Sequence, residues 1–128
     1  MKRTTLGRTG IEVSEYCLGT MTFGTNTTEA DAHRQLDMSL HFGIDFLDTA
    51  EMYPVNPVRK ETVGVTEEVI GRWIAKSGRQ NDYVIATKCA GENSSFVREG
   101  QTVDGSVIRA ACESSLKRLQ IDTIDLYQ

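Results

Sequence analysis

Short apolar runs alternate with amphipathic helical segments along this chain, and the alternation limits the possible folds more than any other feature. The runs cover residues 16–20, 44–48, 83–88 and 123–128. Helical periodicity fills the stretches between them, and no linker-like segment interrupts the order. Regular succession of strand, helix and strand indicates parallel strands joined by right-handed crossovers. We therefore predict an α/β fold in a single unit.

The predicted helices carry recognisable start and stop signals. Thr28 is a suitable cap for a helix that runs to about residue 41, and Gly43 follows as a left-handed stop. Thr66 is the expected cap of the second helix, and Asp104 or Ser106 that of the third. The apolar face of the third helix is expected to comprise Ile108, Ala111, Ser115, Leu116 and Leu119.

The N-terminal residues and the first strand narrow the fold further. Residues 3–6 and 11–13 flank the turn GRTG and predict a β-hairpin. No GxGxxG turn follows the first apolar run, which weighs against a dinucleotide-binding Rossmann domain and favours a barrel. An eight-stranded barrel needs about 250 residues. We therefore predict that residues 1–128 form the N-terminal half of a (β/α)8 TIM barrel, preceded by the hairpin.

Composition excludes several classes of partner. The net charge is -4 and the pI about 5.2, without a basic patch for nucleic-acid phosphates. No apolar run approaches a membrane span and no apolar region follows the charged N-terminus, so we expect a cytoplasmic protein without membrane contact. Cys17, Cys89 and Cys112 lack CxxC spacing and predict reduced structural thiols; we expect no metal site.

Three side chains with complementary chemistry follow two of the predicted strands. Asp48 ends one run, Tyr53 lies in the loop behind it, and Lys88 ends the next run. Because the carboxyl ends of barrel strands open on one face, we expect these side chains to converge, with the Tyr53 hydroxyl hydrogen-bonded to the Lys88 amine. An ammonium favours a phenolate, and a carboxylate can hold the ammonium in place. Ordinary roles remain open: a turn cap, a packing aromatic and a solvated lysine. The connection 54–65 is long enough to indicate a functional loop.

The motifs around these residues resemble the aldo-keto reductases, particularly a bacterial branch of that family. The matching stretches are LGTMTFG, GIDFLDTAEMY, ATK and SLKRLQIDTIDLYQ, and the resemblance covers essentially the whole chain. It implies that Tyr53 is a proton donor tuned by Lys88 and Asp48. It also implies NADPH as cofactor and an aldehyde or ketone as substrate, reduced by hydride transfer. The residues that would border the nicotinamide are Gly19, Thr20, Met21 and Asp48.

The chain departs from the family pattern at its C-terminal end. The family's fourth catalytic residue is a histidine shortly after the LYQ of the fourth strand, and this sequence ends at Gln128. His33 and His41 lie on the first predicted helix and do not replace it. We therefore expect a truncated form, inactive alone, that self-associates through exposed strand edges. The alternative is a non-catalytic binding or regulatory module that keeps the fold, as in ion-channel β subunits.

Overall fold

A four-stranded parallel sheet forms the centre of the computed structural model, which describes residues 1–92 and 94–128. The strands follow the chain in the order β3-β4-β5-β6. Leu18 of β3 pairs with Leu47 of β4, and Leu47 with Ile85 of β5. The predicted α/β fold with parallel strands is therefore confirmed. The strands are β3 (Cys17–Gly19), β4 (Phe46–Asp48), β5 (Val84–Thr87) and β6 (Leu126–Tyr127).

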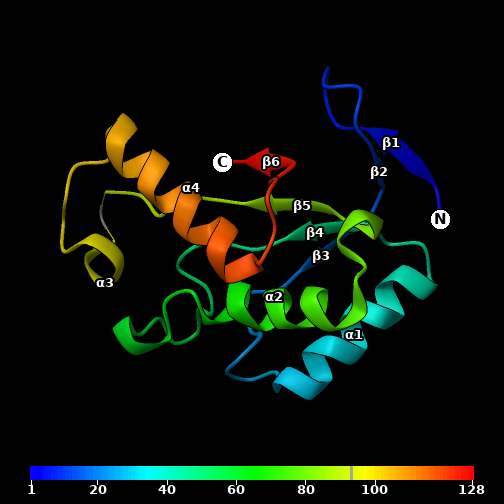
Figure 1. The fold of residues 1–128 in the computed structure, drawn as a ribbon, viewed down its shortest axis with the longest axis horizontal. Coiled ribbons are helices and arrows are strands. Elements are labelled where there is room, and N and C mark those ends of the chain that lie inside the picture. The colour runs from blue at the N-terminus through cyan, green and yellow to red at the C-terminus, as the bar shows by residue number, and fades with distance from the viewer. Residues whose placement is uncertain (93) are drawn as a thin grey trace.

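Three long helices cover one face of this sheet, as Figure 1 shows. They are α1 (Glu29–His41), α2 (Val65–Ser77) and α4 (Gly105–Leu119), and each follows one strand and precedes the next. Short elements lie in the connections: η1 (Lys60–Thr62), η2 (Gln80–Asp82) and α3 (Ser95–Arg98). No helix in the described residues has the length and apolar character needed to cross a membrane.

The apolar core lies between the sheet and these helices. Leu47 and Ile85 point toward the helices and are 0% and 1% exposed. They pack with side chains from all three helices, including Leu36, Trp73 and Leu119. Neighbouring positions on the strands alternate in direction, so every second residue faces away from the helices.

Two of the predicted helix signals are confirmed and one is wrong. Thr28 caps α1 by accepting the Asp31 N–H, and Gly43 follows the helix with a φ of 77°. Thr66 does not cap α2, because the helix begins at Val65 and Gly64 is its cap. The Thr66 hydroxyl is buried and donates to the Phe23 carbonyl at 2.7 Å. A long-range bond therefore takes the hydroxyl that local sequence assigns to the cap.

The third predicted helix is confirmed with one exception on its apolar face. Asp104, rather than Ser106, caps α4 by accepting two backbone N–H groups. Ile108 belongs to the predicted apolar face but is 41% exposed. It lies in the first turn of α4, which extends past α2, whereas the end of α4 packs closely on Gly71.

The predicted hairpin is also confirmed. Strands β1 (Arg3–Thr5) and β2 (Glu12–Ser14) pair antiparallel. The Asp45 carboxylate, just before β4, accepts from the Arg3 guanidinium and, at 2.9 Å, from the Ser14 N–H. The hairpin therefore lies at the N-terminal ends of the parallel strands, opposite the end at which α3 lies (Figure 1).

Candidate active site

A bidentate ion pair joins the carboxyl ends of β4 and β5. The Lys88 ammonium donates to both oxygens of Asp48, at 2.8 and 2.9 Å, and to the Thr49 carbonyl at 2.9 Å. Asp48 is the last residue of β4 and Lys88 directly follows β5, so the parallel register brings them together. Both side chains keep about a third of their surface exposed, 31% and 29%. The pair is thus accessible from the face opposite the three long helices.

Tyr53 completes the predicted group, but through its ring rather than its hydroxyl. The Lys88 ammonium lies 4.7 Å from the centre of the Tyr53 ring, within the range of a cation–π contact. An ammonium has three donors, and Asp48 and Thr49 supply three acceptors. The predicted hydrogen bond from Tyr53 to Lys88 is therefore not among the hydrogen bonds of the described residues.

Backbone hydrogen bonds fix the segment that carries Tyr53. Beyond the strands, the Thr49 N–H donates to the Ala86 carbonyl and the Glu51 N–H to the Lys88 carbonyl. The Tyr53 carbonyl accepts from the N–H groups of Gly64 and Thr66, at 3.1 and 3.3 Å. The connection 54–63 therefore leaves Tyr53 and returns to the same carbonyl at the start of α2.

A second ion pair, absent from the sequence predictions, lies beside this segment. Nη2 of Arg98 in α3 donates to both carboxylate oxygens of Glu51. The two side chains are only 9% and 8% exposed. Burial, the largest single influence, acts to lower the pKa of Arg98, but the hydrogen bond to Glu51 and the attraction of nearby negative charge, chiefly that of Glu51, together outweigh it, so the pKa is raised. In the sequence, the only signal of this ion pair is the charged Glu51 within the buried run after β4, because its partner Arg98 stands 47 positions away.

The predicted cofactor residues lie at the end of β3, next to Asp48. Gly19 is exposed, and a Cβ added to it would meet nothing within 4 Å. Met21 is 47% exposed. Thr20 is fully buried, and its hydroxyl donates to the Asp48 carbonyl at 2.8 Å. Thr20 thus supports Asp48 from behind, and its side chain does not face the open space.

The remaining candidates have structural surroundings. Burial raises the pKa of the Cys89 thiol, which argues against a reactive thiolate beside Lys88. Nε2 of His33 lies 2.9 Å from the Val69 carbonyl, between α1 and α2 and away from the strand ends. In the part of the chain that the structure describes, no three His, Cys, Asp or Glu residues form a group suited to a metal ion.

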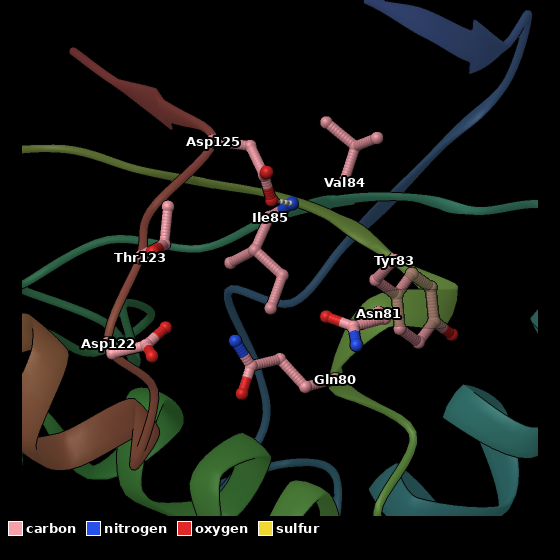
Figure 2. Close-up of a pocket in the computed structure, with 8 residues that line it drawn as sticks. All are labelled: Gln80, Asn81, Tyr83, Val84, Ile85, Asp122, Thr123 and Asp125. Carbon is pink, nitrogen blue, oxygen red and sulfur yellow. Dashed lines mark hydrogen bonds between the residues drawn. The ribbon is translucent and has the colours of Figure 1, made fainter.

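Two hollows lie near opposite ends of the parallel strands. One has a volume of about 380 Å³ and lies at the N-terminal ends of β5 and β6. Figure 2 shows its lining residues, including Gln80 and Asp122. This hollow contains none of the predicted site residues and lies at the wrong end of the strands. The other, a shallow groove of about 420 Å³, is lined in part by Met52, Val58 and Phe96, and belongs to the loops at the carboxyl ends.

Comparisons with known proteins agree with this arrangement. A model of the aldo/keto reductase family matches residues 15–128. Protein tas of Escherichia coli is 50% identical over 121 residues, which are 92% of this chain and 35% of that protein. The uncharacterized oxidoreductase YrpG of Bacillus subtilis is 42% identical over 132 residues, with 100% of this chain and 39% of that protein covered. This chain thus spans little more than a third of the length of these relatives.

A solved structure shows the same arrangement of elements. The holo form of the aldo-keto reductase AKR11C1 from Bacillus halodurans superposes with a TM-score of 0.79 at 35% identity. The likeness covers 100% of this chain and 39% of that protein. It confirms the prediction that these strands and helices correspond to part of a barrel.

Proposed function

This chain belongs to the aldo/keto reductase family, and on that premise we propose that it supplies the proton-donating part of an NADPH-dependent aldehyde or ketone reductase. The contact among Asp48, Lys88 and Tyr53 is the observation that carries this assignment. An ammonium fixed by a carboxylate against a phenol ring places positive charge where a phenolate forms when the phenol gives up its proton.

The contacts of the three residues support one proposed role for each. Tyr53 donates its proton to the oxygen of the carbonyl substrate. Lys88 stabilises the resulting phenolate by its charge, and Asp48 keeps the ammonium in position through both of its oxygens. To hydrogen-bond the tyrosine oxygen, the Lys88 ammonium must give up one of the hydrogen bonds that it donates to Asp48 or to the Thr49 carbonyl. If the ammonium kept only one of its two hydrogen bonds to the carboxylate, one N–H would become available to Tyr53 and the ion pair would stay intact.

The residues at the end of β3 suit a planar ring. Gly19 presents bare backbone beside open space, and Met21 is exposed next to it. The Asp48 carboxylate has about four lone-pair positions, so it can accept a hydrogen bond from the carboxamide of a nicotinamide ring as well as from Lys88. When bound there, the reduced cofactor would supply the hydride that the carbonyl carbon accepts.

The proposed class of substrate is an aldehyde or ketone with an apolar substituent. Met52, Val58 and Phe96 line the groove among the loops at the same end of the sheet, so an apolar substituent on the carbonyl compound fits this side. Association of this chain through the edges of β3 and β6, and a cytoplasmic location, stay predictions.

The experiment compares the Tyr53→Phe variant with the unsubstituted protein, both prepared as the full-length protein that contains this chain. NADPH oxidation is followed with a reactive aldehyde, and NADPH affinity is measured separately. We expect turnover to fall by about 10² to 10⁴, the usual contribution of a positioned proton donor, with little change in affinity. Tyr16→Phe is the matched control, since Tyr16 is 61% exposed and precedes β3 at its other end.

Two results would contradict the assignment. Near-normal turnover in both Tyr53→Phe and Lys88→Met would show that these residues do not carry the proton transfer. Tight NADPH binding by the native protein, without reduction of any aldehyde or ketone in a broad panel, would favour the non-catalytic binding module instead.

A further inference from the structure

We propose, on the basis of the proposed reductase function, that Glu51 and Arg98 are positioning residues. Their buried ion pair fixes the position of the loop that carries the proton donor Tyr53 relative to the backbone of Lys88. Neither side chain is assigned a contact with substrate or cofactor.

Glu51 connects the two loops through its backbone and its side chain. Its N–H donates to the Lys88 carbonyl at 3.1 Å, and its carboxylate accepts the Ala90 N–H at 2.9 Å. Arg98 closes the arrangement, because Nη1 donates to the Ala90 carbonyl at 3.0 Å while Nη2 donates to Glu51. A displacement of Glu51 would therefore move the backbone on both sides of Cys89, and with it Lys88. Tyr53 lies only two residues further along the chain.

The burial of this pair is difficult to explain by stability alone. Only 9% and 8% of the two side chains is exposed, and removing two charges from water carries a large desolvation cost. In proteins generally, well-packed apolar side chains of similar size often stabilise a fold as well as a buried ion pair does. A planar guanidinium, however, directs its donors at fixed angles to the carboxylate and the Ala90 carbonyl, which specifies one geometry. A positioning role accounts for what apolar packing would not provide.

A solvent-exposed ion pair between the same two loops offers a matched control. Lys60, in the loop after Tyr53, pairs with Glu99, the neighbour of Arg98, at 2.6 Å. These side chains are 66% and 75% exposed. The two pairs thus link the loops that follow β4 and β5, but only the buried pair is hydrogen-bonded to the backbone beside Lys88.

The experiment compares the double variants Glu51→Gln/Arg98→Met and Lys60→Met/Glu99→Gln in the full-length protein. The measurements are kcat and KM for aldehyde reduction, thermal unfolding, and hydrogen exchange of the Glu51, Tyr53 and Ala90 amides. For the buried pair we expect kcat to fall by about 10²-fold, as for a displacement of about 1 Å in a reacting group, with KM changed much less. The three amides should exchange faster. The exposed pair should leave all of these unchanged.

The single variant Arg98→Met separates positioning from stability. It leaves a buried carboxylate unpaired, so both thermal stability and turnover should fall. Neutralising the partner as well, in the double variant, should restore much of the stability but not kcat. Recovery of both, or native amide exchange in the double variant, would overturn the positioning role. If the native protein reduces no carbonyl compound, the proposed function fails, whereas the amide exchange still tests the positioning.

Discussion

The two faces of the parallel sheet differ although they are built from alternate residues of the same strands. Leu47 and Ile85 point to the helices and are almost completely buried. Phe46 and Val84, each one position earlier, point away from the helices and stay partly exposed. The helices of this chain thus complete only one face. Asp48 and Lys88 lie on the other, where each side chain keeps about a third of its surface exposed.

Truncating one side chain on each face is the most direct test of this difference. Leu47→Ala should lower the free energy of unfolding by about 2–5 kcal/mol, because it leaves a cavity among packed side chains. Phe46→Ala, on the open face, should cost about 1 kcal/mol, since less apolar surface returns to water. Urea unfolding of both variants checks the difference. Equal losses would show that the open face is packed as tightly as the covered one.

The contact between α2 and α4 offers a second test of the covered face. A Cβ at Gly71 would lie 2.1 Å from the Arg118 carbonyl oxygen, which belongs to the backbone and cannot rotate away. Gly71→Ala should therefore separate the helices and lower the free energy of unfolding by about 1–3 kcal/mol.

Gly105→Ala is the control for that substitution. Gly105 is the first residue of α4, and a Cβ there would meet nothing within 4 Å. Alanine should raise the free energy of unfolding by about 0.4–1 kcal/mol, because it restricts the unfolded chain. A stabilised Gly71→Ala protein would show that the two helices are not held as closely as described.

The smallest expected effect lies at the end of the sheet that carries the hairpin. Burial acts to raise the pKa of Asp45, but the Arg3 guanidinium and the Ser14 N–H outweigh it, so the pKa is lowered on folding. A lowered pKa means that the stabilisation is present above the unfolded value of about 4 and is lost as pH falls through the folded value. Asp45→Asn should cost about 1 kcal/mol at pH 7 and almost nothing at the lowest pH.

Urea unfolding of the native and Asp45→Asn proteins, at pH 7 and in steps below pH 4, measures this difference. Asp122→Asn is the control, because Asp122 is exposed and its replacement should shift stability by less than about 0.5 kcal/mol at either pH. A constant difference between the native and Asp45→Asn proteins across the range would contradict the role of the ionised carboxylate.

Much of the fold could be predicted because it is specified by local patterns. Thr28 and Gly43 bound α1 as expected, since a cap and a left-handed stop depend on neighbouring residues. The failures have a non-local origin. Thr66 bonds to Phe23, which lies 43 positions away, and Ile108 is exposed because periodicity defines a helical face but not how far its neighbour extends.

The candidate site was predictable to the same extent. Asp48 and Lys88 could be paired in advance, because parallel strands end on one side of a sheet. Whether the Lys88 ammonium contacts the ring or the hydroxyl of Tyr53 depends on which acceptors surround the ammonium. One of these acceptors, the Thr49 carbonyl, is a backbone group that no sequence pattern indicates. Glu51 and Arg98 were missed because only the folded loops bring them into contact.

The connection 54–63 begins and ends at the Tyr53 carbonyl, which accepts the N–H groups of Gly64 and Thr66. Its two ends are therefore fixed to one point, whatever its length. The entropic cost of closing a flexible loop rises only slowly as residues are added, about 0.6 kcal/mol for each doubling. Insertions and replacements in this connection can accordingly reshape the groove without displacing the tyrosine. Under the proposed function, the recognition of new carbonyl compounds would therefore be open to change, by evolution or by engineering, separately from the proton transfer.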